Sequence, residues 1–271
     1  MRLIERERVT TFVGVPTQSH DLLESPKFAT TDTSSLQSVG GGGAAAPTAL
    51  VKRIESSFKR GRPNIGYGMT EANACIITPL RGRRKTGSIG VPIGDVEAKI
   101  VDVETGTTTL PPGTIGELVL RCPQQMQGYW KKPDETAKVL RDGWLYTGDY
   151  ASVDDEGFIY IRGRKSDMIK FMGHRISPLE IESAINSCPC VKESAAVETR
   201  QEGIPAIKAY IILEKECDLE DLKKMIHNKL PMYMRPQFYE LSAALPRTEN
   251  GKIKRSELRN HGSYRREICA E

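Results

Sequence analysis

The sequence lacks several features that would assign it to a familiar class of protein. None of its apolar runs approaches the ~20 residues of a membrane-spanning helix, and the charged start Met1–Thr10 does not resemble a signal peptide. The net charge of +4, from 39 Lys and Arg against 35 Asp and Glu, is small and dispersed. No internal repeat is present. We therefore expect neither a transmembrane segment nor a nucleic-acid partner.

Residues that bind metal ions through sulfur or imidazole are also sparse. Of the six cysteines only Cys188 and Cys190 lie close together, and there are four histidines. A zinc site needs Cys-x-x-Cys or histidine partners at ligand spacing, and this sequence has none. Our interpretation is a reduced, cytoplasmic protein whose thiols are structural. The cysteines are at positions 75, 122, 188, 190, 217 and 269.

A length of 271 residues is sufficient for two hydrophobic cores. Between residues 87 and 123 short strands alternate with Gly and Pro turns, which indicates a β-rich subdomain. Beyond Arg164, helices and strands alternate over about a hundred residues, the common size of a domain. We expect an α/β fold that divides at 165–167, with residues 1–164 in one domain and residues 165–271 in a small α+β domain.

Apolar periodicity and turn residues predict the individual elements of these two domains. The expected helices span 17–24, 47–58, 133–140, 178–186 and 219–229. The expected strands span 10–16, 35–39, 64–67, 97–103, 117–121, 146–149, 158–162, 191–198, 206–213 and 237–241, and a further strand broken by Gly173 precedes the helix at 178.

The segment Tyr146–Glu182 places an acid and a base on one hairpin. Asp149 ends the first strand and Arg164 follows the second, with a turn at 154–157 between the two strands. An acid accepts hydroxyl protons and arginine forks onto phosphate oxygens, so the pair suits a ribose and a phosphate. The alternative is structural, because aspartate near a turn is most often a turn former.

A run of glycines at 40–43 follows the expected strand 35–39 and precedes the helix 47–58. Strand, glycines and helix in that order let backbone N–H groups approach an anion or a flat ring. The run fits neither the P-loop pattern nor the GxGxxG dinucleotide fingerprint. A flexible loop is an equal alternative.

Two further loops carry side chains that could bind a nucleotide or a metal ion. After the strand 64–67, Tyr67 offers a ring for stacking a base, and Thr70 and Glu71 offer oxygens for Mg²⁺ or phosphate. The alternative is a capped turn between strands. Near the end, a glycine-turned loop at 250–255 projects Lys252, whose default interpretation is a solvated surface charge.

Six segments taken together resemble the adenylate-forming superfamily of acyl-CoA synthetases, luciferases and peptide-synthetase adenylation domains. They are YGMTEA (67–72), GELVLRCPQQMQGYW (116–130), YTGD (146–149), GRKSDMIKFMGHRISPLEIE (163–182), LPMYMRP (230–236) and PRTENGKIKR (246–255). VGVPT (13–17) and SVGGGGAAAP (38–47) also resemble the family's substrate and adenine regions. The resemblance implies that residues 1–164 are the later part of the large AMP-binding domain. Residues 165–271 would then be the small C-terminal AMP-binding-enzyme domain.

The resemblance implies an AMP-forming acid–thiol ligase that uses ATP, Mg²⁺ and coenzyme A. A carboxylate, with a fatty acid the favoured class, attacks the α-phosphate of ATP to give an acyl-adenylate and pyrophosphate. The thiol of coenzyme A then displaces AMP. The expected partners are therefore a small carboxylic acid, ATP and coenzyme A.

The resemblance also assigns roles to individual residues of the nucleotide site. Tyr67, with Gly68 beside it, would stack on adenine, and Gly43, Ala44 and Ala45 would line its other side. Thr70 and Glu71 would act as catalytic residues that hold phosphate and Mg²⁺. Asp149 would bind the ribose hydroxyls, and Arg164 would contact ribose or phosphate.

Three residues of the small domain would serve the two steps of the reaction. Lys252 would neutralise charge at the crowded α-phosphate, which is electrostatic catalysis by a positioned cation. Gly173 would open a passage for pantetheine that a β-carbon would block, and Arg175 would contact phosphate during thioester formation. The small domain would present Lys252 and Gly173 to the active site in turn.

The sequence departs from the family pattern at several places. The phosphate loop should precede VGVPT by a long stretch, and this sequence starts too late to contain it, so we expect the chain by itself to be inactive. Its first sheet would then expose unpaired strand edges. Ala45 replaces the usual proline, and Ser166 stands where many members have Asp or Lys at the hinge. A peptide-synthetase adenylation domain and a non-catalytic nucleotide-binding or interaction fragment remain alternatives.

Overall fold

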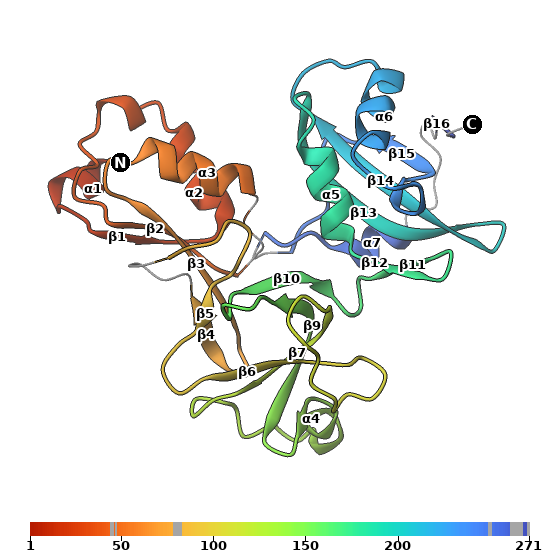
Figure 1. The fold of residues 1–271 in the computed structure, drawn as a ribbon. Helices are drawn as coiled ribbons and strands as arrows, with labels where there is room; N and C mark the ends of the chain where they lie inside the picture. The colour runs from red at the N-terminus through yellow and green to blue at the C-terminus, as the bar shows by residue number, and fades with distance from the viewer. Residues whose placement is uncertain (44–45, 47, 78–82, 249–250, 261–267, 270–271) are drawn as a thin grey trace. The chain divides into compact units, whose positions relative to one another are not determined.

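The computed structural model describes residues 1–43, 46, 48–77, 83–248, 251–260 and 268–269. The chain divides into two compact units, Met1–Ile161 and Arg162–Glu271 (Figure 1). The division falls three residues before the boundary that the sequence predicts at 164/165. Each unit is described by itself below.

The first unit begins with a small sheet in which three parallel strands are joined by helices. The strands occur in the order β1-β2-β3-β4-β5, with β1, β2 and β3 parallel and the later pairs antiparallel. This is the β-α-β-α-β connection expected of an α/β fold, and both crossover helices pack on one face of the sheet (Figure 1). The elements are α1 (Arg2–Arg6), β1 (Thr11–Val13), α2 (Pro16–Glu24), the 3₁₀ helix η1 (Phe28–Thr30), β2 (Ser38–Gly41), α3 (Thr48–Ser57), β3 (Arg62–Met69), β4 (Asn73–Ile77) and β5 (Val91–Pro92).

The glycine run is part of this sheet, which corrects the prediction that it forms a loop after the strand. Gly40 and Gly41 lie inside β2, and β2 begins at Ser38 rather than at residue 35. A β-carbon on Gly40 would lie 2.3 Å from the carbonyl oxygen of Asn64, and one on Gly41 would lie 2.1 Å from that of Gly14. Glycine is therefore required at both positions, because the backbones of Asn64 and Gly14 lie too close to β2 to leave room for a side chain.

A second, antiparallel sheet completes the first unit and corresponds to the expected β-rich subdomain. Its strand order is β10-β9-β7-β6, with the short β8 paired to β9. The core beneath it contains Ile100, Leu118, Leu120, Leu145 and Ile159. The elements are β6 (Glu97–Val101), β7 (Gly116–Arg121), α4 (Pro133–Val139), β8 (Leu140–Arg141), β9 (Trp144–Val153) and β10 (Ile159–Arg164), of which the last runs across the division into the second unit.

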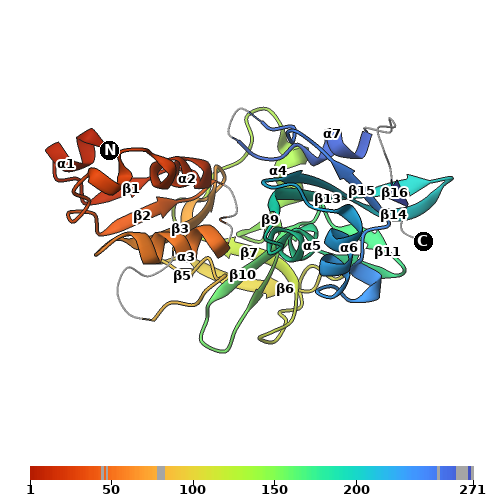
Figure 2. The same ribbon diagram turned by 90° about the horizontal axis from the view of Figure 1, so that it is seen from above.

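The second unit is an α+β sandwich around the sheet β13-β14-β15-β16. Helices α5 and α6 bury Ile181, Ile185, Leu222 and Ile226 against one face of this sheet, and α7 buries Leu258 against the other (Figure 2). The elements are β11 (Ile169–Phe171), β12 (His174–Ile176), α5 (Pro178–Asn186), β13 (Val191–Gln201), β14 (Ile204–Leu213), α6 (Leu219–His227), the 3₁₀ helix η2 (Met232–Met234), β15 (Phe238–Leu241), α7 (Arg255–Asn260) and β16 (Ile268–Cys269).

The helix boundaries of this unit follow from local sequence. Pro178 occupies the first turn of α5, where its missing N–H has no partner to lose. Asp218 caps α6 by accepting hydrogen bonds from the backbone N–H groups of Glu220 and Asp221. In the part of the chain that the structure describes, no helix is long and apolar enough to cross a membrane.

Candidate nucleotide site

The turn between β3 and β4 carries the side chains that the sequence assigns to the nucleotide. The pairing of β3 with β4 shifts register between Tyr67 and Gly68 and then continues to Met69. Thr70 and Glu71 then form a tight turn, closed by a hydrogen bond of 3.0 Å from the N–H of Ala72 to the carbonyl of Met69. The structural alternative of a turn between strands is therefore correct for the backbone. It is compatible with a site, because the turn leaves Thr70 exposed and Glu71 half-buried.

A hydrogen bond joins two candidate residues that are 82 positions apart in the chain. The hydroxyl of Tyr67 donates to Oδ2 of Asp149 across 2.5 Å. Asp149 is buried, with an exposed fraction of 4%. The contact places an aromatic ring and a carboxylate side by side, which is an arrangement that can receive a base and the hydroxyls of its sugar.

The position of Asp149 results from an irregularity in strand β9. Gly148 has a left-handed φ of +70°, and the pairing of β7 with β9 shifts register at this point. The hydroxyl of Thr147 accepts the N–H of Asp149 at 3.1 Å and donates to the carbonyl of Leu118 at 2.7 Å. A bulge re-aims a side chain at the end of regular pairing, and here it fixes the carboxylate of Asp149.

Glu71 is held by a loop from another part of the first unit. Its Oε1 accepts a hydrogen bond of 2.6 Å from the hydroxyl of Tyr129, and its backbone carbonyl accepts one of 2.7 Å from the N–H of Met126. The hydrogen bond to Glu71 and partial burial raise the pKa of Tyr129 to about 12. The phenol is therefore the donor and the carboxylate the acceptor at neutral pH.

The donor set at this turn fits Mg²⁺ in the company of a nucleotide. Mg²⁺ prefers oxygen ligands and is usually held by one or two carboxylates together with substrate phosphates. Thr70 offers a hydroxyl, and the carboxylate of Glu71 accepts no hydrogen bond at Oε2 within the described chain. Among the described residues no group of three or more His, Cys, Asp or Glu side chains could hold a metal ion by itself. Phosphate oxygens would therefore have to complete the coordination.

In the second unit, Lys252 projects from a loop that two arginines hold in place. The side chain of Lys252 is exposed, and the loop closes through a hydrogen bond of 2.8 Å from the N–H of Thr248 to the Lys252 carbonyl. Before this turn, Arg247 contacts both carboxylate oxygens of Glu193 and donates to the carbonyl of Gly251 at 2.7 Å.

After the turn, Arg255 contacts Glu182 of α5 at 2.6 and 2.7 Å. Both side chains of this pair are largely buried, with exposed fractions of 13% for Arg255 and 8% for Glu182. Burial raises the pKa of Glu182 to about 7, although the charge of Arg255 and the N–H of Ala196 act in the opposite direction. The Lys252 loop is thus anchored at both ends to the core of the small unit.

Gly173 lies in the turn of a hairpin, which corrects the prediction of one strand broken by this glycine. Strands β11 and β12 are antiparallel, and Met172 and Gly173 between them have φ values of +48° and +77°. Two successive positive φ values are typical of a two-residue hairpin turn. A β-carbon on Gly173 would meet nothing within 4 Å, so backbone conformation explains the glycine locally. Arg175 is exposed on β12.

The remaining candidates are placed as follows. Gly43 is exposed and has a left-handed φ of +84°. Ala44 and Ala45 lie outside the described residues. Arg164 ends β10 and belongs to the second unit.

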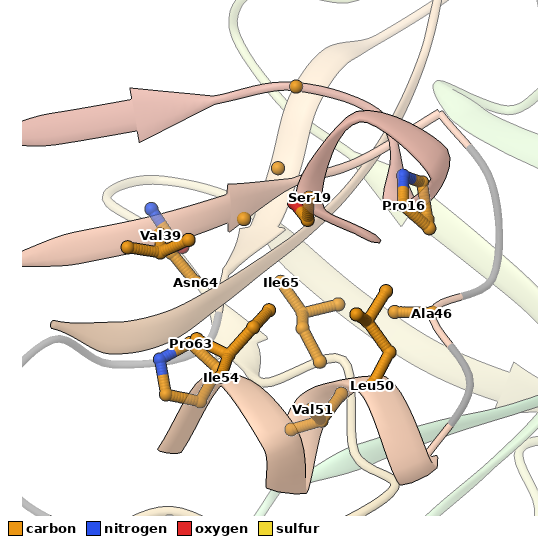
Figure 3. A pocket seen from close by; sticks show the side chains of 13 residues that line it. Pro16, Ser19, Val39, Ala46, Leu50, Val51, Ile54, Pro63, Asn64 and Ile65 are labelled. Carbon is orange, nitrogen blue, oxygen red and sulfur yellow. The ribbon is translucent and has the colours of Figure 1, made fainter. Parts of the chain in front are cut away.

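A small cavity lies between α2, α3 and the sheet of the first unit (Figure 3). Its volume is about 20 Å³, which is room for about one water molecule. Oγ of Ser19 and Oδ1 of Asn64 belong to residues that line it, and within the described chain these two buried atoms have no hydrogen-bond partner. The cavity has room for one ordered water, and it is too small for a substrate.

Sequence reasoning missed the residues that hold the candidates in place. Tyr129, Glu182 and Arg255 were part of the quoted motifs, but no role was assigned to them. Their partners lie 58 or 73 positions away. No local pattern shows such a pairing, so only the folded structure identifies them.

Two family models match the chain. They are "AMP-binding enzyme" over residues 1–130 and "AMP-binding enzyme C-terminal domain" over residues 180–252. The chain belongs to the AMP-binding enzymes of the adenylate-forming superfamily, which confirms the resemblance and the fold class inferred from sequence.

Proteins of known sequence and structure give the same result. The long-chain-fatty-acid–CoA ligase of Bacillus subtilis is 38% identical over 267 residues, covering 95% of this chain and 46% of that protein. Feruloyl-CoA synthase of Amycolatopsis sp is 34% identical, covering 94% and 52%. ATP-bound MatB from Rhodopseudomonas palustris superimposes with a TM-score of 0.88 at 29% identity, covering 94% and 51%. The chain thus spans about half the length of the relatives it matches.

Proposed function

We propose that this chain carries the adenosine-binding part and the mobile small domain of an AMP-forming acid–thiol ligase. The observation that supports this most directly is the 2.5 Å hydrogen bond between Tyr67 and Asp149. It joins a ring that can stack on a base to an acceptor for sugar hydroxyls. In the proposed reaction a carboxylate attacks the α-phosphate of ATP, pyrophosphate leaves, and a thiol then displaces AMP.

Each candidate side chain has a separate task in this proposal. Tyr67 stacks on adenine, and Asp149 accepts hydrogen bonds from the ribose hydroxyls. Thr70 and Glu71 hold the phosphates together with Mg²⁺, which would supply charge neutralisation at the phosphate oxygens when bound. Arg164 contacts ribose or phosphate.

The two elements of the small unit serve different steps. Lys252 stabilises the charge that develops at the α-phosphate during adenylate formation. The β11–β12 hairpin, with Gly173 and Arg175, acts in thioester formation with coenzyme A. Since these are separate elements of one unit, a hinge motion of that unit would present each of them to the nucleotide in turn.

The acid is proposed as a small carboxylic acid, with a fatty acid as the favoured class. The Bacillus subtilis relative is named for long-chain fatty acids and the Amycolatopsis relative for ferulic acid. Both classes share a carboxylate and an apolar body. Measuring AMP release from ATP and coenzyme A with a panel of fatty and aromatic acids would choose between them.

A second candidate function follows from the length of the match. Because the chain spans about half of its relatives, it could bind a nucleotide without catalysing the reaction. We expect the 271-residue chain by itself to bind AMP and to show no pyrophosphate exchange, since it spans only about half the length of the relatives it matches. Exchange by the purified chain at a rate comparable to that of a complete ligase would contradict this.

A further inference from the structure

We propose that Tyr129 is a positioning residue that holds the carboxylate of Glu71 in the orientation in which it binds Mg²⁺ with the nucleotide phosphates. The inference rests on the proposed function, because it assumes that Glu71 faces a metal-bound nucleotide. It goes beyond that function by assigning a role to the loop before Tyr129, for which the sequence suggests none.

The loop 122–129 packs against the turn that carries Glu71, and three contacts join the loop to residues 71–72. The thiol of Cys122 lies 3.9 Å from the carbonyl of Ala72, and the N–H of Met126 donates to the carbonyl of Glu71 at 2.7 Å. The third contact is the 2.6 Å hydrogen bond from the hydroxyl of Tyr129 to Oε1 of Glu71. Backbone and side chain of Glu71 are therefore both fixed by one segment.

Tyr129 is itself anchored on the opposite side by helix α4. Its N–H donates to Oγ1 of Thr136 at 2.9 Å, and its carbonyl accepts the N–H of Lys132 at 3.1 Å. Gly128 permits this approach, because its φ is +150° and a β-carbon there would lie 2.9 Å from Cγ2 of Thr136. The backbone of Tyr129 is thus fixed by contacts that do not involve Glu71, and its phenol reaches the glutamate from this fixed position.

One oxygen of the Glu71 carboxylate can still bind a metal ion. Tyr129 donates to Oε1 alone, and within the described chain Oε2 of Glu71 accepts no hydrogen bond. A hydroxyl donor is uncharged, so it orients the carboxylate without cancelling its negative charge, as an arginine or lysine would. A half-buried glutamate at a turn would otherwise populate several rotamers, and ordering it would oppose metal binding.

The test measures how much Mg²⁺ strengthens ATP binding by the 271-residue chain. Dissociation constants for ATP are determined by isothermal titration calorimetry with and without Mg²⁺, for the wild type, Tyr129→Phe and Tyr146→Phe. Tyr146→Phe is the matched control, since its hydroxyl donates to the carbonyl of Gly106 at 2.7 Å in the same unit. In Tyr129→Phe, we expect the factor by which Mg²⁺ increases ATP affinity to be roughly tenfold smaller than in the wild type. The affinity for ATP without metal should be unchanged, and Tyr146→Phe should behave as the wild type.

Two further variants separate positioning from structural support. Glu71→Gln should lose the Mg²⁺-dependent gain, and adding Tyr129→Phe to it should have no further effect, because the two groups act as one unit. Should Tyr129→Phe fail to fold, Thr136→Val and Thr136→Ser test the anchor instead. The valine variant, which lacks the hydroxyl, should lose part of the gain, and the serine variant should retain it.

The possible outcomes are distinct. If Tyr129→Phe keeps the full Mg²⁺-dependent gain, or weakens metal-free and metal-bound ATP equally, the positioning role is wrong. A wild-type chain that binds ATP but gains nothing from Mg²⁺ also overturns the inference, while the nucleotide site stands. A wild-type chain that binds ATP under neither condition contradicts the proposed function, and the inference with it.

Discussion

The two regions that carry the proposed chemistry are held together by different kinds of contact. In the first unit, uncharged hydroxyls bind carboxylates, as Tyr67 does with Asp149 and Tyr129 with Glu71. In the second unit, arginines pair with glutamates on both sides of Lys252. The two kinds of contact differ in the net charge that remains on the paired groups. A hydroxyl leaves a carboxylate negative, whereas an arginine neutralises it.

Each region therefore presents one sign of charge to a ligand. In the first unit, Oε2 of Glu71 accepts no hydrogen bond within the described chain, so this carboxylate can face a cation. In the second unit the Arg–Glu pairs cancel, and Lys252 makes no ion pair within the described chain, so it remains as the cation of its loop. This complementarity is what transfer at a phosphate requires, because negative charge develops there and needs a positive group.

The largest effect is expected from removing that cation. In a complete ligase containing this sequence, Lys252→Ala should slow adenylate formation by about 10²–10³, while thioester formation from a synthetic acyl-adenylate survives. Gly173→Leu should show the opposite pattern, because it replaces the turn glycine of the hairpin assigned to the thiol step. Pyrophosphate release and thioester formation are measured for both. Loss of the same half-reaction to the same degree in the two variants would rule out separate roles.

The next effect concerns the buried pair behind the Lys252 loop. Arg255→Met should destabilise the second unit by about 3–5 kcal/mol at pH 8, because it leaves the carboxylate of Glu182 buried without its partner. Urea unfolding monitored by circular dichroism gives the free energy. Arg247→Met serves as the comparison, since its partner Glu193 is about one-third exposed, and it should cost less than 1 kcal/mol. Equal losses in the two variants would contradict the burial argument.

Glu182 also predicts a pH dependence. Its pKa is raised to about 7 in the folded protein, above its ordinary value, so the folded state binds more protons between about pH 4.5 and 7. The stability that this group contributes is present below that range and is lost as pH rises through 7, by up to about 3 kcal/mol. Glu182→Gln should remove this slope. Parallel pH profiles of unfolding free energy in wild type and variant would show that Glu182 titrates normally.

A smaller effect is expected at the hydroxyl of Tyr67. Tyr67→Phe keeps the ring that stacks on adenine and removes the donor to Asp149. AMP affinity should fall only a few-fold, since a single hydrogen bond contributes roughly 1 kcal/mol net. Tyr67→Ala should lose considerably more, because stacking is lost as well. Equal affinities in the two variants, determined by calorimetry, would show that the ring does not stack.

The bounds of an element were predictable where interactions between residues close in sequence determine them. Helix α5 has the predicted bounds Pro178–Asn186, because a proline in the first turn and apolar residues on one face act within a few residues. The glycine run was misplaced for the opposite reason. What requires Gly40 and Gly41 is the backbone of Asn64 and Gly14, which comes close only after the chain has folded.

The candidate site was predictable only through its motifs. The structure brings Tyr67 and Asp149 together, but nothing in their 82-residue separation indicates a contact, and their roles remain predictions. The supporting contacts of Tyr129 and Arg255 depend on tertiary packing between elements far apart in sequence. Gly173 shows a further limit, since a glycine in a sequence gives no indication whether its backbone or the space beside it is needed.

The most direct test of the account is AMP binding by the 271-residue chain and its Asp149→Ala variant. AMP lacks the β- and γ-phosphates, so calorimetry with AMP and without metal reports on the contacts to the base, the ribose and the α-phosphate. Asp155→Ala, an exposed aspartate in the neighbouring turn, is the control and should bind AMP as wild type. We predict that Asp149→Ala weakens AMP binding by roughly tenfold or more, since hydrogen bonds to a charged acceptor are lost. An unchanged affinity for AMP in Asp149→Ala would contradict the account.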